Sequence, residues 1–156
     1  MSIQKVLDAA RAEIGYKEKP NNDNKFAKVA GHANNQPWCA TFVRACFVDG
    51  GQKDAIPNTA SVKEIYNWAV KNNALVTKQT AKAGDLILMT FTAGSKTPEH
   101  VGILVKDFNL KENVWHTIEG NTGKPGASQA NGDGVYKKDR PLGYIHSVVR
   151  PKWKTQ

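Results

Sequence analysis

Two cysteines and four histidines are the residues of this sequence best suited to nucleophilic chemistry. Cys39 follows Pro37 and Trp38 at the start of an apolar run with the character of a helix, and Pro37 suits the first helical turn. At a helix N-terminus, unpaired N–H groups and the positive end of the dipole favour the thiolate, which is the nucleophilic form of cysteine. Cys39 is therefore either a nucleophile or a small buried residue, and a neighbouring base would distinguish the two.

Cys46 lies seven residues further along the same helical run. That spacing separates the two cysteines by about 10 Å at 1.5 Å per residue, which is beyond disulfide reach. An interior position in an apolar helix is typical of a packed core residue. We predict that both thiols are free and that only Cys39 is placed for chemistry.

His100 is the histidine best placed to act as a base. It precedes the apolar run of residues 101–105, which predicts a strand that would fix the ring while its tip faces a groove. His32 lies in a polar segment and is expected to be solvated, whereas His116 and His146 fall inside strand patterns and are expected to be ordinary sheet residues.

A third polar group is needed to hold the imidazole in one tautomer. Glu119 and Asn121 end the next predicted strand, and they would lie beside His100 if the two strands form a hairpin. Taken singly, each is also typical of a solvated strand end or a turn. In combination with Cys39 and His100 they favour a catalytic triad.

The elements that must position these residues change character along the chain. Helical patterns cover residues 3–14, 26–30 and 38–48, and a fourth begins after Ser61, where Glu64 completes a capping box. Five β-rich runs follow, at residues 85–91, 100–108, 114–119, 134–139 and 143–149. Helices followed by antiparallel strands predict an α+β fold. The loop of residues 120–133 lies between strands and is expected to border the site.

Composition limits the classes of function. A chain of 156 residues with 40% hydrophobic content predicts one domain, spanning residues 1–156. Its 22 basic and 14 acidic residues give a net charge of +8, which either serves solubility or attracts polyanions. No basic helix or aromatic platform indicates nucleic-acid binding. No signal peptide or membrane-length apolar segment is present in the sequence, so we expect synthesis in the cytoplasm without membrane insertion.

Four motifs occur in the order PWCATFVRACF, GDLILM, EHVGILV and TIEGN. Together they resemble the CHAP domain, the cysteine- and histidine-dependent amidohydrolase/peptidase module of phage endolysins and bacterial peptidoglycan hydrolases. The resemblance covers nearly the whole chain. It implies a papain-like (NlpC-type) fold in which the nucleophile helix packs on a small antiparallel sheet.

The resemblance also implies a role for each residue of the site. Cys39 would attack an amide carbonyl, and His100 would activate the thiol and then protonate the leaving amine. Glu119 and Asn121 would orient the imidazole ring, and water would hydrolyse the acyl-enzyme.

Two residues before the nucleophile are candidates for contact with the substrate. The backbone N–H of Cys39 would bind the oxyanion, with Gln36 as a candidate second donor. Trp38 would either line the groove or anchor the helix.

Some CHAP domains bind calcium in the segment before the nucleophile. In this sequence Asp23 is the only carboxylate of that segment, and Lys25 and Lys28 interrupt it. Calcium sites require several oxygen ligands, and no cysteine or histidine cluster has zinc spacing. We therefore predict neither a metal nor a cofactor.

The function implied is a peptidoglycan hydrolase, either an N-acetylmuramoyl-L-alanine amidase or an endopeptidase, between which the sequence does not choose. We expect a phage-encoded monomer that acts on the wall after release from the cell, with anionic wall polymers as further partners. The alternatives are an interbacterial amidase toxin and a catalytically silent wall-binding module.

Overall fold

The computed structural model describes residues 2–124 and 132–154. The helices of this part are α1 (Ser2–Ala12), α2 (Phe26–Ala30), α3 (Cys39–Asp49) and α4 (Val62–Lys71). The strands are β1 (Leu75–Val76), β2 (Leu86–Met89), β3 (His100–Leu104), β4 (Val114–Thr122), β5 (Gly134–Pro141) and β6 (Ile145–Val149). Short 3-10 helices occupy Lys53–Ala55, Lys78–Thr80 and Leu142–Tyr144. Within the described ranges no helix is long and apolar enough to cross a membrane.

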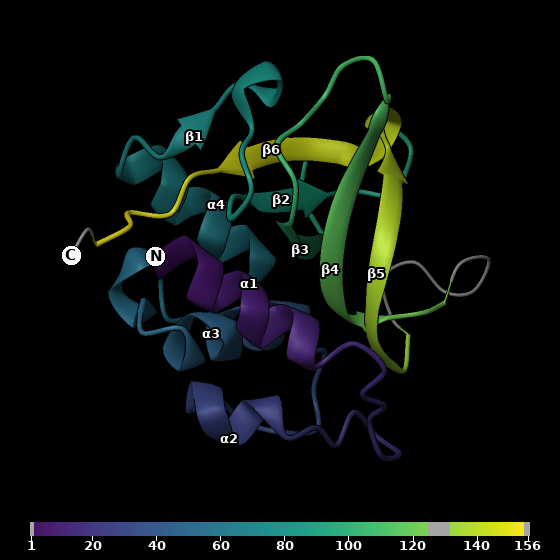
Figure 1. Ribbon diagram of the computed structural model, residues 1–156. Helices are drawn as coiled ribbons and strands as arrows, with labels where there is room; N and C mark the ends of the chain where they lie inside the picture. The colour runs from purple at the N-terminus through teal and green to yellow at the C-terminus, as the bar shows by residue number, and fades with distance from the viewer. Residues whose placement is uncertain (1, 125–131, 155–156) are drawn as a thin grey trace.

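The six strands form one antiparallel sheet in the order β1-β6-β2-β3-β4-β5. The helices gather to one side of it, and β4 and β5 form the long hairpin at its far edge (Figure 1). In the centre, Leu86 pairs with Ile103, which pairs in turn with Ile118. The predicted α+β class is confirmed, as is the pairing of the strand of His100 with the strand of Glu119.

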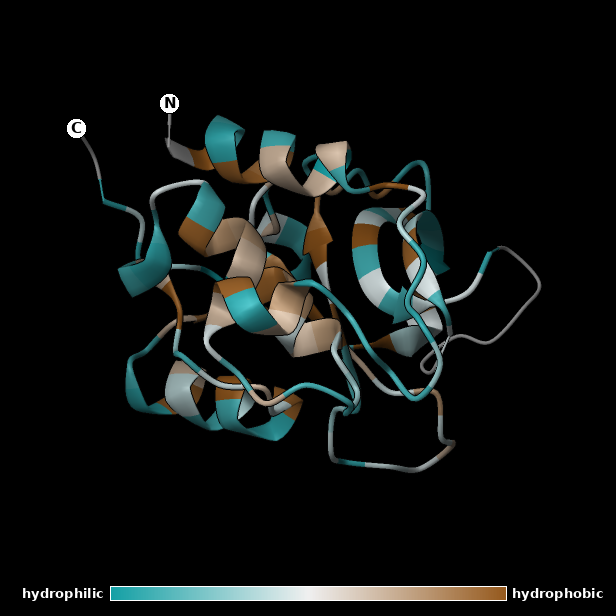
Figure 2. Cartoon of the chain, turned by 90° about the horizontal axis from the view of Figure 1, so that it is seen from below, coloured by the Kyte–Doolittle hydropathy of each residue, from teal (hydrophilic) through white to brown (hydrophobic). Residues whose placement is uncertain are grey.

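The strands bury side chains on both faces of the sheet. Ile103 and Ile118 belong to the large core that the sheet shares with α1 and α3. Leu104 and Trp115 alternate with them and belong to a smaller core on the opposite face. Figure 2 shows hydrophobic segments gathered between the helices and the sheet, with hydrophilic connections outside.

The predicted helices are present with small shifts. Ser61 caps α4 by accepting a bond of 3.2 Å from the backbone N–H of Glu64, and Gly15 adopts a φ of 98° just after α1. One expectation was wrong: α3 begins at Cys39 with Trp38 as its N-cap, so Pro37 lies outside the helix. A proline here still has no N–H to satisfy, which suits the segment that leads into a helix.

The predicted strands differ mainly at their ends. The runs of residues 85–91 and 100–108 yield the shorter strands β2 and β3, which end at Met89 and Leu104, and residues 90–91 and 105–108 lie outside helices and strands. The run of residues 114–119 continues to Thr122, and the two-residue strand β1 was not predicted. Of the expected loop of residues 120–133, the part from 125 to 131 lies outside the described residues.

Gly120 allows β4 to approach the first turn of α3. A Cβ atom at this position would lie 2.6 Å from Phe42 Cβ and 2.8 Å from Trp38 Cζ3. Carbon atoms do not approach this closely, so the contact requires a residue without a side chain. The contact joins the strand that carries Glu119 to the helix that begins at Cys39.

We predict that Gly120→Ala destabilises the protein by about 1–3 kcal/mol, because the added methyl group overpacks the contact with Phe42 and Trp38. Urea unfolding followed by tryptophan fluorescence measures the change. Gly143→Ala is the matched control, since nothing lies within 4 Å of a Cβ there. Equal unfolding midpoints for both variants would contradict the close approach of β4 and α3.

Candidate active site

Cys39 is the first residue of α3, and its side chain is 7% exposed. No side chain caps this end of the helix. The first N–H groups of a helix have no partner within it, so those beside Cys39 can bind a negatively charged atom. Cys46 is buried in the core, where burial raises the pKa of its thiol well above the ordinary value. Both thiols are free, as predicted, and their environments differ as predicted.

His100 and Glu119 meet inside the protein. His100 is the first residue of β3, and its Nε2 lies 2.8 Å from Oε1 of Glu119 on β4. Both side chains are fully buried. Gly102 makes room for this contact, since a Cβ there would lie 2.6 Å from Cγ of Glu119. The glycine of the His-Val-Gly motif thus lets the carboxylate lie over β3 and reach the histidine.

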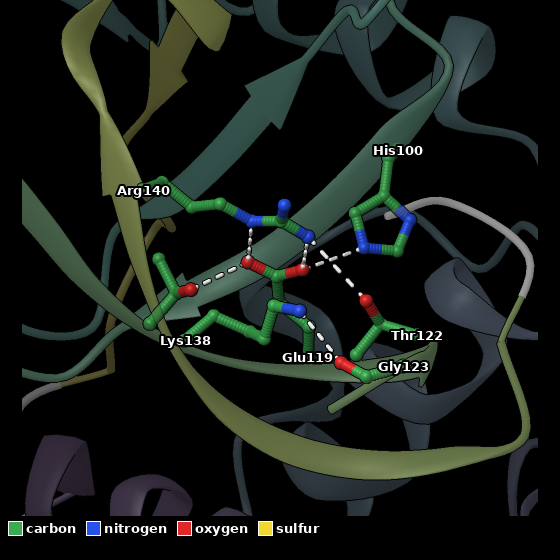
Figure 3. A network of polar contacts seen from close by, with 7 residues as sticks. His100, Glu119, Thr122, Gly123, Lys138 and Arg140 are labelled. Atoms are coloured by element: carbon green, nitrogen blue, oxygen red, sulfur yellow. Dashed lines mark hydrogen bonds and ion pairs between the residues drawn. The ribbon is translucent and has the colours of Figure 1, made fainter. Parts of the chain in front are cut away.

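Glu119 has further partners on its other sides (Figure 3). Arg140 of β5 donates from Nε to Oε2 at 2.9 Å and from Nη2 to Oε1. Thr117 donates its hydroxyl to Oε2 at 2.5 Å. The guanidinium of Arg140 also lies 4.9 Å from the ring centre of Phe91. Each oxygen of the buried carboxylate is therefore held by at least two donors.

These contacts shift the two ionisation equilibria in opposite directions. Burial lowers the pKa of His100, but hydrogen bonding and charge interaction with Cys39 and Glu119 outweigh it and raise this pKa to about 9. Burial raises the pKa of Glu119, but Arg140 and His100 outweigh it and lower this pKa to about 2. At neutral pH the pair is an imidazolium and a carboxylate.

The two ring nitrogens of His100 have separate partners. Glu119 occupies Nε2, which leaves Nδ1 as the nitrogen that can exchange a proton with Cys39. Nδ1 is buried and has no regular hydrogen bond, while the thiol of Cys39 contributes to the raised pKa of the ring. An imidazolium beside a cysteine stabilises the thiolate. The arrangement can therefore supply a sulfur nucleophile and a proton from one pair of side chains.

Asn121, the other candidate for orienting the ring, has a different environment. It lies at the irregularity of β4 with a φ of 53° and is fully buried, and its amide has no hydrogen-bond partner among the described residues. The contact with His100 is made by Glu119 instead. A catalytic role for Asn121 stays a prediction.

Gln36 and Trp38 lie on either side of Pro37. Gln36 donates its amide to the carbonyl of Ala33 at 3.2 Å, so its role at the oxyanion also stays a prediction. Trp38 is completely buried, stacks on Phe26 at 5.5 Å, and donates its indole N–H to Glu18 at 2.8 Å. These contacts support the anchoring alternative for Trp38, and its contact with substrate stays a prediction.

Sequence reasoning missed two buried cations of β5, Lys138 and Arg140. Lys138 donates to the carbonyl of Gly123 at 2.6 Å, and burial lowers its pKa. The run GVYKKDRP has the charge expected of a solvated edge strand. The available signal was its period of two, because Lys138 and Arg140 alternate with the exposed Lys137 and Asp139.

His32, outside the site, lies in the polar segment as expected and is half-buried. His32 is not fully solvated, because its ring is hydrogen-bonded to Thr41 of α3 at 2.9 Å and to Asn58 at 2.7 Å. It ties the polar segment before Cys39 to the nucleophile helix. Across the described ranges, no group of three or more His, Cys, Asp or Glu residues could hold a metal ion.

Comparisons with known proteins bear on the fold. No protein-family model and no curated protein matches the sequence. A Staphylococcus aureus protein described as similar to a lipoprotein of the NLP/P60 family superposes with a TM-score of 0.54 at 16% identity, over 98% of this chain and 42% of that one. The peptidoglycan hydrolase RipB from Mycobacterium tuberculosis superposes with a TM-score of 0.56 at 19% identity, over 97% of this chain and 66% of that one. The predicted papain-like, NlpC-type fold is confirmed.

We predict that Glu119→Gln lowers the pKa of His100 from about 9. Burial lowers this pKa, and a neutral glutamine amide stabilises the imidazolium less than the carboxylate does. NMR titration of the histidine ring signals measures this pKa. His116 is the internal control: Glu112 and Asp139 raise its pKa, and the substitution does not touch them. An unchanged His100 titration would contradict the ionic contact.

The same shift makes stability depend on pH. The pKa of His100 is raised from 6.5 to about 9 on folding, so its stabilising contribution is complete below pH 6.5 and disappears as pH rises through 9. We expect the unfolding free energy of the wild type to fall more steeply across this range than that of Glu119→Gln. Denaturant unfolding at a series of pH values measures both slopes, and parallel slopes would refute the linkage.

Proposed function

We propose that this protein is a peptidoglycan hydrolase that cleaves an amide bond in the peptide part of the bacterial cell wall, with Cys39 as nucleophile. The observation that carries the proposal is the buried contact of His100 with Glu119 beside Cys39 at a helix N-terminus. The fold shared with the peptidoglycan hydrolase RipB supports the choice of substrate.

The chemistry begins with proton transfer between Cys39 and His100. The imidazolium of His100 carries on Nδ1 the proton that the thiol has given up, and the thiolate attacks the carbonyl carbon of the amide. The carbonyl oxygen becomes an oxyanion, which the free N–H groups at the start of α3 stabilise. His100 then gives its proton to the nitrogen of the leaving amine, and a thioester remains on Cys39.

Water completes the cycle. His100, now neutral, takes a proton from the attacking water, and the thioester collapses to a free carboxylic acid and the Cys39 thiol. Glu119 stays ionised throughout, because Arg140 and Thr117 bind its oxygens independently of the histidine. Its function is to keep Nδ1 facing the sulfur and to stabilise the imidazolium at each transfer.

Substrate reaches this centre from the side of Cys39. Among Cys39, His100, Glu119 and Asn121, only the cysteine keeps any appreciable exposure. A long, flexible substrate therefore meets the nucleophile first, while the proton-transfer groups remain shielded from water. Both an N-acetylmuramoyl-L-alanine amidase and an endopeptidase are compatible with this geometry. The CHAP assignment rests on the resemblance of the motifs.

We predict that Cys39→Ala abolishes cleavage of purified peptidoglycan, because no other group can form the thioester. Mass spectrometry of the digest identifies the products: intact stem peptides with glycan ending in free lactyl groups indicate an amidase, and cut stems or cross-bridges indicate an endopeptidase. Cys46→Ala is the matched control and retains cleavage, because Cys46 is buried in the core. Products that survive Cys39→Ala, or no products from the wild type, would leave a binding module as the better description.

Positive charge supports attraction to anionic wall polymers. The chain carries a net charge of +8. A cavity of about 360 Å³ is lined by Arg11, Lys106, His116 and Lys137, although Glu112 contacts two of these side chains. We propose that this surface raises the local concentration of the enzyme at the wall.

If charge brings the enzyme to the wall, cell lysis falls steeply as salt rises from low to physiological concentration, because the screening length shortens to about 8 Å. Turbidity of a cell suspension measures lysis, and circular dichroism confirms that the fold is unchanged. Lys137→Glu should lower lysis at low salt and reduce the salt dependence. Lysis that is insensitive to salt at constant stability would exclude this mode of attraction.

A further inference from the structure

Arg140 binds both carboxylate oxygens of Glu119 and shares Oε1 with the imidazole of His100. It lies opposite Trp115 in the β4–β5 register, is 1% exposed, and donates from two nitrogens to the two oxygens of the carboxylate. Such two-point contacts between a planar guanidinium and a carboxylate fix the plane of the carboxylate as well as its charge. A comparable pair lies elsewhere among the described residues: Arg150 donates to both oxygens of the buried Asp85 and remains about one-third exposed.

Glu119 requires a permanent cation to stay ionised. A carboxylate removed from water takes up a proton unless nearby charges and donors compensate for the lost hydration. His100 cannot serve alone, since it becomes neutral whenever it has given its proton to the leaving amine. A guanidinium does not lose its proton in proteins. Arg140 is therefore the partner that holds the carboxylate in one state through the cycle.

The remaining charged groups around this pair do not replace Arg140. The titratable groups that act on His100 and Glu119 are Cys39 from α3 and Arg140 from β5, besides each other. Lys138, also from β5, is influenced by Glu119 but donates its ammonium to the carbonyl of Gly123 (Figure 3). Its charge is thus directed at the end of β4 and not at the carboxylate oxygens.

We propose that Arg140 is a positioning residue for the base: it keeps Glu119 ionised and aims Oε1 of that carboxylate at Nε2 of His100. The proposal rests on the proposed function, in that it assigns Arg140 to the same proton-transfer step. Two contributions of Arg140 can be separated: its positive charge and its two-point contact with the carboxylate. A lysine at this position would supply the charge without the two-point contact, and a methionine would supply neither.

The first experiment measures ionisation of Glu119 directly. In protein labelled with ¹³C at the glutamate side chain, the Glu119 carboxyl of the wild type stays ionised to about pH 2. In Arg140→Met we expect its titration midpoint to rise by roughly 1–3 pH units, and in Arg140→Lys to remain close to the wild type. Arg150→Met is the matched control, which removes a two-point contact elsewhere and leaves Glu119 unchanged. An unchanged Glu119 midpoint in Arg140→Met would overturn the proposal.

The second experiment separates positioning from a purely structural role. We expect Arg140→Lys to lower kcat for peptidoglycan cleavage by about 100-fold with little change in KM, because the base is misplaced while the charge is kept. In a Glu119→Gln background the same substitution should have little further effect, because the residue through which Arg140 acts is already altered. If the fold reductions in kcat of the two substitutions multiply in the double variant, Arg140 acts independently of Glu119 and the proposal is wrong.

The outcomes remain distinguishable from failure of the proposed function. If the wild type does not cleave peptidoglycan, the rate at which iodoacetamide alkylates Cys39 replaces kcat, since it reports the same proton transfer to His100. If Arg140→Met does not fold, Arg140→Lys and the double substitution decide the question. If neither Arg140→Lys nor Arg140→Met changes the titration midpoint of Glu119 or the alkylation rate of Cys39, Arg140 has only a packing role and the proposal is wrong.

Discussion

The carboxylate of Glu119 is buried away from water, and the need to compensate its charge constrains the rest of the structure. Ionised groups avoid the protein interior unless charge and hydrogen bonds replace their hydration. Arg140, Thr117 and His100 supply that replacement from three neighbouring strands, and Gly102 supplies the space. Any strand register that separated these groups would leave a buried charge without a partner. The chemistry of the site and the pairing of β3, β4 and β5 are thus fixed by the same interaction.

Close packing of β4 on α3 brings Cys39, the proposed nucleophile, to this charge pair. Gly120 lets β4 touch the first turn of α3, so that the residue beside Glu119 in sequence lies against Trp38 and Phe42. Trp38 in turn is tied to Glu18 in the preceding segment. Cys39 consequently begins a helix that is held by the apolar contacts of Trp38 and Phe42 and by the hydrogen bond of Thr41 with His32. The sulfur is in this way held near the imidazolium, and Cys39 remains 7% exposed.

Some of these contacts join neighbouring elements of the chain and others join distant ones, and this difference explains which parts of the site the sequence could predict. Cys39 and His100 mark the beginnings of a helix and a strand, which local patterns reveal, and Glu119 follows from the hairpin that joins adjacent strands. Arg140 belongs to the strand after that, in a run whose charges suggest exposure. The period of two in this run was a local signal of its burial, but it does not identify the carboxylate 21 residues away that the guanidinium binds. The position of Pro37 outside the helix is a boundary effect of one or two residues, the least certain feature of any pattern.

Sharing Glu119 between two cations also suits the two opposite tasks of His100. In the proposed mechanism the histidine accepts a proton from the thiol, which favours a strong carboxylate partner, and then releases it to the amine, which favours a weak one. A carboxylate bound to the imidazole alone would hold the proton tightly or, in the absence of any other cation, become protonated itself. Because Arg140 takes part of the charge, Glu119 stays ionised while its pull on the imidazolium is divided. The balance that the proposed acid and base chemistry needs is therefore built into the sheet, through a guanidinium that is 1% exposed.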